Sequence, residues 1–220
     1  MTDRHARLRS AHLYLVCDDQ SDEFLAGALG AGVDIVQLRK KDASDDAIVS
    51  AGRRFASAAA AHGALFILND RPDLVAATGA DGVHVGQDDT TVADARATGG
   101  PDRIVGLSTH SPAQVDAAAD AEVDYIGVGP VHATPTKPGR PAVGLDLVRY
   151  AAAHPSVPFF AIGGIAPANV GAVHGAGATR IAVVRALTDA PDVAEAARSL
   201  RAGITATAGR PREARVGSAR

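Results

Sequence analysis

The sequence predicts a single-domain α/β protein, a closed (β/α)₈ TIM barrel, from three observations. Short runs rich in Val, Ile and Leu alternate along the 220 residues with Ala-rich segments whose apolar residues have helical spacing. Eight such runs separated by helices favour parallel strands that close into a barrel. The alternative is an open doubly wound sheet, but CDDQSDE follows the first run where that fold would place G-x-G-x-x-G.

Each strand is expected at one apolar run, and the expected strands span 13–17, 33–38, 65–68, 82–85, 104–107, 125–128, 159–162 and 180–183. Four stretches repeat one pattern of helix end, turn and strand, which supports this count: GAGVDIVQL, TGADGVHVG, DAEVDYIGVG and GAGATRIAVV. Helices are expected at 43–62, 112–121, 145–154 and 167–175. Ser44, Ser111 and Pro167 are typical helix openers, and Gly63, Gly79, Gly99 and Gly175 are typical stops.

Charge and composition divide the chain into a body and two ends. Both ends are rich in arginine, whereas the total charge is −3, so the body is acidic. We expect an N-terminal tail at 1–10, the barrel at 11–202 and a flexible C-terminal tail at 203–220, where Ala, Gly, Arg and Pro follow no periodicity.

Composition also excludes several classes of protein. No run approaches the roughly 20 apolar residues of a membrane span, and no apolar stretch of signal-peptide length follows the first arginines. Cys17, the single cysteine, excludes an internal disulfide. An acidic body with five Phe, three Tyr and no Trp argues against a nucleic-acid surface. We expect a cytoplasmic protein that acts on small molecules, with no nucleic acid and no membrane, and a homo-oligomer remains open.

Two cations are expected at the mouth of the barrel after the second strand. Alternation along QLRKKD places Gln37, Arg39 and Lys41 on one side, and catalytic residues of this fold lie at the carboxyl ends of strands. Only three of the 22 basic residues are lysines, so this chain uses arginine for most positive charges. Lys41 and Lys137 are therefore candidates for positions that require the compact point charge of an ammonium group. Such a pair suits a phosphate or diphosphate. The alternative is a solvated loop that forms salt bridges.

Carboxylates follow the next two strands. Asp70 comes after the third and Asp89 after the fourth, and the ends of adjacent parallel strands lie close enough for both to meet. Two carboxylates beside a diphosphate make an Mg²⁺ site, with Asn69 as a neutral contact to substrate. The alternative is that Asp70 and Asp89 cap helices.

The remaining strand ends offer hydrogen-bonding groups, a long loop and a phosphate site. Ser108 is expected to form a hydrogen bond with substrate, and His84 is expected to be a hydrogen-bonded core histidine. Thr134, Thr136 and Lys137 lie in the longest loop, where a lone lysine among prolines favours a lid over a mobile linker. After the seventh and eighth strands, the backbone at Gly164 and the side chain of Arg185 suit the usual phosphate site of this fold. The alternative is that Arg185 is a surface residue.

The ordered set QLRKKD, FILNDR, GVHVGQDD, GLSTH, YIGVGPVHATPTKPG, AIGGI and AVVRA resembles the thiamine-phosphate synthases, from about residue 13 to residue 200. The resemblance implies a transferase of thiamine biosynthesis that uses Mg²⁺. In that reaction the diphosphate of hydroxymethylpyrimidine diphosphate leaves, in a dissociative step, and the nitrogen of hydroxyethylthiazole phosphate attacks the methylene. The products are thiamine monophosphate and pyrophosphate.

The resemblance also implies residue roles. The metal ligands would be Asp70 and Asp89, and the catalytic residues would be Ser108, Lys137 and Arg39. The pyrimidine diphosphate would be held by Gln37, Arg39, Lys41, Asn69, Ser108 and Lys137, and the thiazole phosphate by Thr134, Thr136, Gly164, Val184 and Arg185.

This chain departs from the family pattern at Arg185, where a small Ser is common, and at Lys40, where an acidic residue is common and a lysine is expected to add charge near the diphosphate. Two other functions remain open. One is a thiazole tautomerase, in which His110 would transfer a proton, and the other is a ligand-binding barrel without catalysis.

Overall fold

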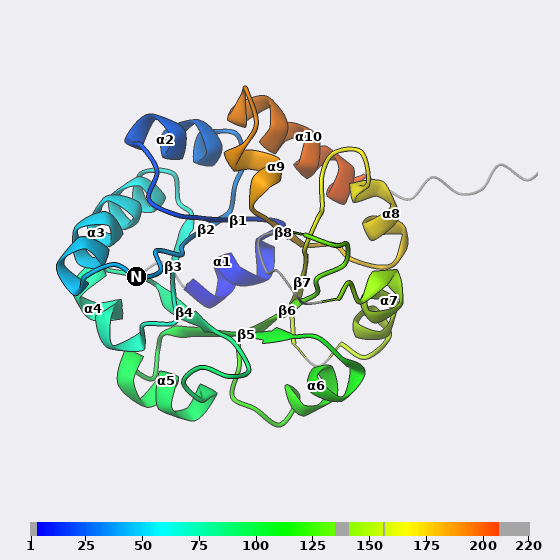
Figure 1. Cartoon of the computed structure of the whole chain (residues 1–220), viewed down its shortest axis with the longest axis horizontal. Helices are drawn as coiled ribbons and strands as arrows, with labels where there is room; N and C mark the ends of the chain where they lie inside the picture. The colour runs from blue at the N-terminus through cyan, green and yellow to red at the C-terminus, as the bar shows by residue number, and fades with distance from the viewer. Residues whose placement is uncertain (1–3, 135–140, 156, 207–220) are drawn as a thin grey trace, which may run out of the picture.

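A computed structural model describes residues 4–134, 141–155 and 157–206. Within these ranges, eight parallel strands form a closed barrel in chain order, with β8 paired to β1 (Figure 1). The strands are β1 (Leu13–Cys17), β2 (Ile35–Leu38), β3 (Leu65–Asn69), β4 (Gly82–Val85), β5 (Ile104–Thr109), β6 (Tyr125–Val128), β7 (Phe159–Ile162) and β8 (Ile181–Val183). The predicted fold is confirmed.

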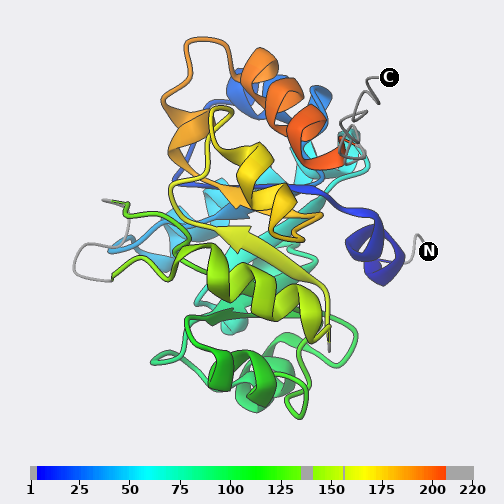
Figure 2. The ribbon, with the colours of Figure 1, turned by 90° about the vertical axis from the view of Figure 1, so that its right-hand side faces the viewer.

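Helices form a ring around the barrel, except for α1 (Arg4–Ser10), which lies at one end (Figures 1 and 2). The ring contains α2 (Asp22–Gly30), α3 (Asp45–Ala61), η1 (Pro72–Leu74), α4 (Val75–Thr78), α5 (Val92–Gly99), α6 (Pro112–Ala117), α7 (Gly144–Ala153), α8 (Val170–Gly175), α9 (Arg185–Thr188) and α10 (Val193–Thr205). No described helix is long and apolar enough to cross a membrane.

Two of the three predicted helix openers cap their helices. The Ser44 hydroxyl accepts the backbone N–H of Ala47, and that of Ser111 accepts the N–H of Gln114, both at 3.3 Å. Pro167 does not open a helix. The side chain of Asn169 accepts the Ala166 N–H at 2.8 Å, and α8 begins only after this turn.

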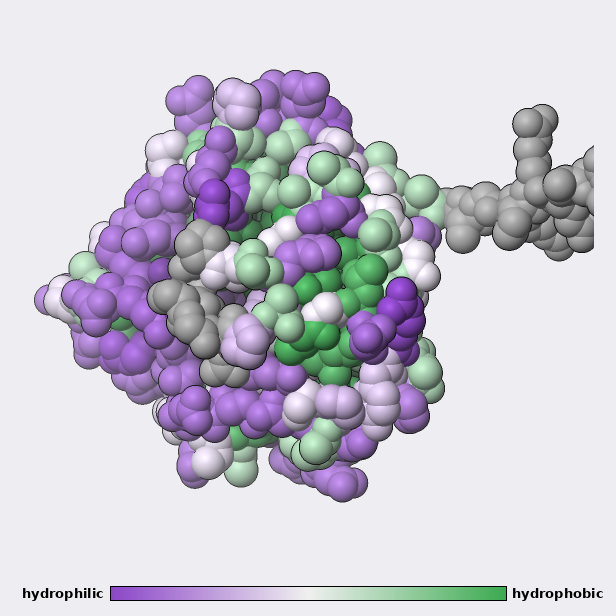
Figure 3. Space-filling view, turned by 45° about the vertical axis from the view of Figure 1, so that its right-hand side comes forward, coloured by the Kyte–Doolittle hydropathy of each residue, from purple (hydrophilic) through white to green (hydrophobic). Residues whose placement is uncertain are grey.

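Hydrophobic residues pack on both sides of the strands, which explains why the strands are nearly continuous apolar runs. One cluster lies inside the barrel and includes Tyr14, Ile67, Tyr125 and Phe160. A second, larger cluster joins the strands to the surrounding helices. Figure 3 shows an outer surface that is largely hydrophilic, with one hydrophobic area near the middle of that view.

The repeated sequence pattern has a structural cause at the amino ends of the strands. An aspartate precedes each of β2, β4 and β6, and its carboxylate accepts a backbone N–H from the preceding odd-numbered strand. These bonds join Asp34 to Leu13, Asp81 to Phe66 and Asp124 to Val105, at 3.0, 3.1 and 2.7 Å. Before β8 the equivalent residue is Arg180, which instead donates to the Arg9 carbonyl at 2.9 Å.

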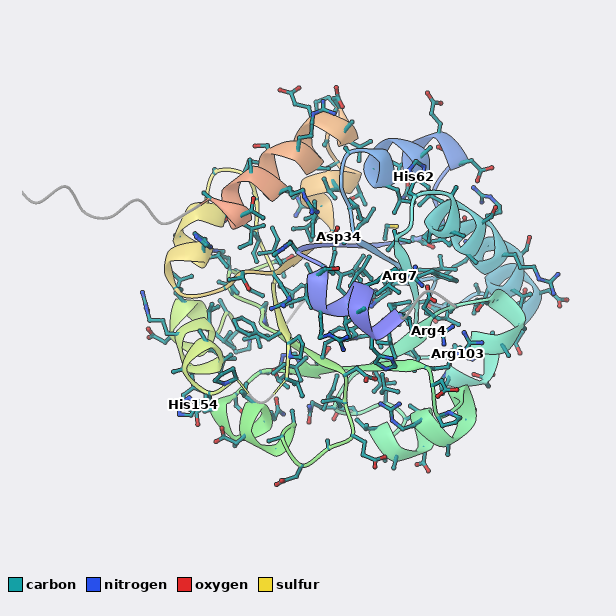
Figure 4. The ribbon with its side chains drawn as sticks, turned by 180° about the vertical axis from the view of Figure 1, so that it is seen from behind. Arg4, Arg7, Asp34, His62, Arg103 and His154 are labelled. Carbon is teal, nitrogen blue, oxygen red and sulfur yellow. The ribbon has the colours of Figure 1, made fainter. Side chains whose placement is uncertain are left out.

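The prediction of a tail at 1–10 is wrong for residues 4–10. This segment is helix α1, which crosses the amino-terminal end of the barrel (Figure 4). Leu8 is only 2% exposed, and the Arg7 guanidinium donates to the Ala64 carbonyl at 2.8 Å. With one buried apolar residue, the helix has no apolar periodicity to reveal it.

The C-terminal boundary of the barrel also differs from the prediction. The last described helix, α10, continues to Thr205, beyond the expected limit at 202. Its buried residues Ala197, Leu200 and Ile204 follow helical spacing and dock the final turn. The rest of the expected C-terminal tail, from 207 onward, lies outside the described residues.

Candidate active site

A cavity of about 450 Å³ is lined by residues at the carboxyl ends of the strands. Helix α1 lies at the other end of the barrel (Figure 2). Ligand cavities in proteins commonly measure about 300–1,000 Å³, so the volume of this cavity suits small molecules. Thr136 and Lys137 lie outside the described residues. The other predicted site residues all line this cavity: Gln37, Arg39, Lys41, Asn69, Asp70, Asp89, Ser108, Thr134, Gly164, Val184 and Arg185.

The lysines after β2 differ in their surroundings. Arg39 and Lys41 line the cavity, as their alternation predicts, whereas Lys40 does not. The Lys40 ammonium lies 3.4 Å from an Asp19 carboxylate oxygen and 3.7 Å from one of Asp18. Two carboxylates outside the cavity lining therefore pair with Lys40, which argues against the expectation that it adds charge near a diphosphate.

Asp70 and Asp89 meet at the ends of β3 and β4. The Asn69 amide donates to an Asp70 oxygen at 2.6 Å, and the Gly86 N–H donates to Asp89 at 2.8 Å. Neither carboxylate caps a helix: Arg71 precedes η1 without a side-chain cap, and Thr91 caps α5. Asp70 has a left-handed φ of +59°, which costs free energy in a non-glycine residue and is typical of functional sites.

The electrostatics of this pair suit a divalent cation. Burial raises the pKa of Asp70 above its ordinary value, and the neighbouring Asp89 charge raises it further, against the Asn69 hydrogen bond and the Lys41 charge. A cation between the two carboxylates would remove their repulsion. The described residues contain no group of three or more His, Cys, Asp or Glu placed for a metal. A two-carboxylate set fits Mg²⁺, which takes its other ligands from water and substrate phosphates.

Ser108 belongs to a hydrogen-bonded group that the sequence only partly predicts. Its hydroxyl lies 3.0 Å from His84 Nε2, and His84 Nδ1 lies 3.0 Å from the Tyr125 hydroxyl. The prediction of a hydrogen-bonded core histidine is confirmed. Tyr14, Tyr125 and Phe160 also line the cavity and were not predicted. The period-two alternation used for β2 would have found them, since it places Tyr14 and Tyr125 on the inner faces of β1 and β6.

The other end of the cavity is formed after β7 and β8. Gly163 and Gly164 have φ values of +105° and +62°, and a Cβ at Gly164 would lie 2.7 Å from the Cβ of His132. Glycine is therefore required for this turn, which leaves its backbone open to the cavity. Arg185 lines the cavity, and its Nε donates to Asp189 at 2.9 Å. This hydrogen bond lowers the pKa of Asp189.

Comparisons with known proteins agree on one family. The family model described as "Thiamine monophosphate synthase" matches residues 13–187. A thiamine-phosphate synthase of Acidothermus cellulolyticus is 50% identical over 210 residues, which cover 92% of this chain and 99% of that protein. One of Gloeobacter violaceus is 50% identical over 192 residues, covering 86% of this chain and 56% of that longer protein.

A solved structure agrees with these sequences. The thiamine phosphate pyrophosphorylase of Pyrococcus furiosus superposes with a TM-score of 0.82 at 30% identity, over 91% of this chain and 97% of that one. The resemblance noted in the sequence is confirmed, and the chain belongs to the thiamine monophosphate synthase family of transferases.

Proposed function

We propose that the protein is an Mg²⁺-dependent thiamine-phosphate synthase. It would join hydroxymethylpyrimidine diphosphate to hydroxyethylthiazole phosphate and release pyrophosphate. One observation carries the proposal beyond family membership: Arg39 and Lys41 line the same cavity as the carboxylate pair of Asp70 and Asp89. Such a set binds and neutralises a diphosphate, whereas a tautomerase acting on a single phosphate has no use for it.

In the reaction, the carbon–oxygen bond between the pyrimidine methylene and the diphosphate breaks, and pyrophosphate leaves with the electron pair. The lone pair of the thiazole nitrogen then forms the new carbon–nitrogen bond. The negative charge that develops on the leaving group is stabilised by Arg39 and Lys41. Asp70 and Asp89 would hold Mg²⁺, which supplies further positive charge to the diphosphate.

The other described residues position the two substrates. Gln37 and Ser108 are buried in the cavity wall and would bind the pyrimidine. The turn at Gly163 and Gly164 would bind the thiazole phosphate by its backbone, with Arg185 at the edge. Lys137 and Thr136, beyond the described residues, keep the roles that the resemblance implies. The pyrimidine cation of a dissociative step would be shielded from water by the apolar part of the cavity.

A two-substrate assay tests this proposal. The purified protein is given both phosphorylated substrates, and thiamine monophosphate is measured with Mg²⁺ and with excess EDTA. We expect product that requires both substrates and Mg²⁺. If the folded protein instead isomerises a thiazole phosphate without any pyrimidine substrate, it is a tautomerase. If it binds the substrates and converts neither, it is a ligand-binding barrel.

A further inference from the structure

A chain of five hydrogen-bonded side chains crosses the barrel beneath the cavity. Gln37 Nε2 donates to the Tyr14 hydroxyl at 2.5 Å, and the Tyr14 and Tyr125 hydroxyls lie 2.9 Å apart. His84 continues the chain from Tyr125 to Ser108, with 3.0 Å at each link. The five residues come from β2, β1, β6, β4 and β5, and all of them line the cavity.

Packing holds the middle of the chain in place. Tyr14 is 2% exposed and Tyr125 is fully buried. Their rings meet edge to face at 5.9 Å between centroids, and each also packs on Phe160, at 5.4 and 5.5 Å. Gly106 leaves the space for the Tyr125 ring, since a Cβ there would lie 2.1 Å from its Cζ.

Proton counting gives the chain a direction. Burial raises the pKa of both tyrosines, so each phenol keeps its single proton at neutral pH. The Gln37 amide nitrogen can only donate, so Tyr14 accepts from it. Among the described residues, the other partner of the buried Tyr14 hydroxyl is Tyr125, so satisfying the Tyr14 hydrogen makes Tyr14 the donor to Tyr125. Tyr125 then donates to His84 Nδ1. His84 consequently carries its proton on Nε2 and donates to Ser108.

We propose that Tyr14, Tyr125 and His84 are positioning residues that set the hydrogen-bonding roles of Gln37 and Ser108. The chain leaves the Ser108 hydroxyl proton free to donate to a ligand and turns the Gln37 carbonyl oxygen into the available acceptor. A substrate ring must then offer an acceptor to Ser108 and a donor to Gln37, as an aminopyrimidine does. This inference rests on the proposed function for the identity of the ring, and on the geometry for the chain itself.

The tautomer of His84 is the first test, and it needs no activity. Long-range ¹H–¹⁵N NMR of the ¹⁵N-labelled protein without substrate is expected to show His84 protonated on Nε2. In Tyr125→Phe the ring packing is kept but Nδ1 loses its donor, so the His84 signals are expected to change. The matched control is Tyr150→Phe, whose hydroxyl binds Asp116 on the surface at 2.8 Å, and it is expected to leave them unchanged. A His84 protonated on Nδ1 in the unmodified protein overturns the proposal.

Kinetics provide the second test. Loss of one hydrogen bond commonly changes a rate by about tenfold, so we expect Tyr14→Phe and Tyr125→Phe to lower kcat/KM for the pyrimidine diphosphate about tenfold each. Tyr150→Phe is expected to stay within about twofold. Equal rates in Tyr125→Phe and Tyr150→Phe overturn the proposal. Failure of the unmodified protein to form product would overturn the proposed function instead, and the NMR result would still decide the direction of the chain.

A double-mutant cycle tests whether Tyr125 acts through Ser108, which it does not contact directly. Ser108→Ala removes the end of the chain. The combined Tyr125→Phe and Ser108→Ala variant is therefore expected to lose less than the product of the two single effects. Multiplicative losses would mean that the tyrosine hydroxyl acts independently, which contradicts the proposal.

Discussion

The carboxyl groups of Asp70 and Asp89 lie near each other in the cavity wall, where the charge of Asp89 raises the pKa of Asp70, and a cation bound between them would relieve this repulsion. Asp70 is held there in a left-handed backbone conformation, and Asn69 orients its carboxylate. The proposed Mg²⁺ would offset the free energy that this arrangement costs the folded protein. It also leads to a prediction that separates stability from activity.

Asp70→Asn is expected to stabilise the protein in EDTA at neutral pH while lowering synthase activity by about 100-fold or more. The raised pKa means that the ionised Asp70 opposes folding, and this cost is fully present at pH values above its folded pKa. The stability difference should shrink as the pH falls through the raised folded pKa of Asp70, and it should be lost below the ordinary value of 3.8, where the carboxyl is protonated in both states. Urea unfolding from pH 3 to pH 8 measures it.

The neighbouring Asp88→Asn is the control for Asp70→Asn, because Asp88 is exposed and does not line the cavity. Asp88→Asn should change neither the free energy of unfolding nor the activation free energy of the reaction by more than about 0.5 kcal/mol. Lower stability of Asp70→Asn than of the unmodified protein in EDTA at pH 7 would contradict the account of this site.

The two adjacent lysines after β2 provide a matched pair. Lys41→Ala is expected to lower kcat/KM for the pyrimidine diphosphate by about 10- to 100-fold, since a hydrogen bond to a charged group contributes about 1.5–3 kcal/mol. Lys40→Ala should stay within about threefold, because Asp18 and Asp19 already neutralise Lys40 outside the cavity. Steady-state kinetics of both variants measure kcat/KM. A larger loss in Lys40→Ala than in Lys41→Ala would contradict the assignment of Lys41, and not Lys40, to diphosphate binding.

Substitution of Arg185 should change the KM of only one of the two substrates. We expect Arg185→Ala to raise KM for the thiazole phosphate by about tenfold and to leave KM for the pyrimidine diphosphate unchanged, because Arg185 lies at the glycine-rich end of the cavity. Asp189→Ala removes the competing carboxylate and is expected to lower the same KM. An unchanged KM in Arg185→Ala would show that the guanidinium serves only its ion pair with Asp189.

The backbone at Gly164 should not tolerate a side chain. Gly164→Ala is expected to lower the free energy of unfolding by about 1–2 kcal/mol, because alanine disfavours the φ of +62° at this position. The close contact of the added methyl group with His132 should lower it further. Gly171→Ala is the matched control, because the same methyl group there meets nothing within 4 Å and lies in α8. It should stabilise by about 0.5–1 kcal/mol. Urea unfolding at one pH compares both, and equal effects would refute the role given to Gly164.

Local patterns predicted the barrel well, because its strands are apolar on both faces and its caps are short-range. Ser44 caps α3 through a residue three positions away, a distance that sequence can judge. Helix α1 was missed because Arg7 finds its partners at Ala64 and Asp81, far along the chain. Interactions of that separation exist only after the barrel has closed.

The site was predicted by residue type but not by geometry. Metal ligands and helix caps use the same aspartates at the same spacing, so only the structure could exclude capping for Asp70 and Asp89. Likewise, Tyr14 and Tyr125 are 111 residues apart, and nothing local indicates that their hydroxyls meet. The direction of a hydrogen-bonded chain depends on all of its members together.

The most direct test of the account is to measure thiamine monophosphate and pyrophosphate in the same reaction, with both substrates present and Mg²⁺ or EDTA added. We predict that the two products appear in equal amounts with Mg²⁺ and that neither forms in EDTA. Consumption of the thiazole phosphate without release of pyrophosphate would contradict the claim that this cavity neutralises a departing diphosphate.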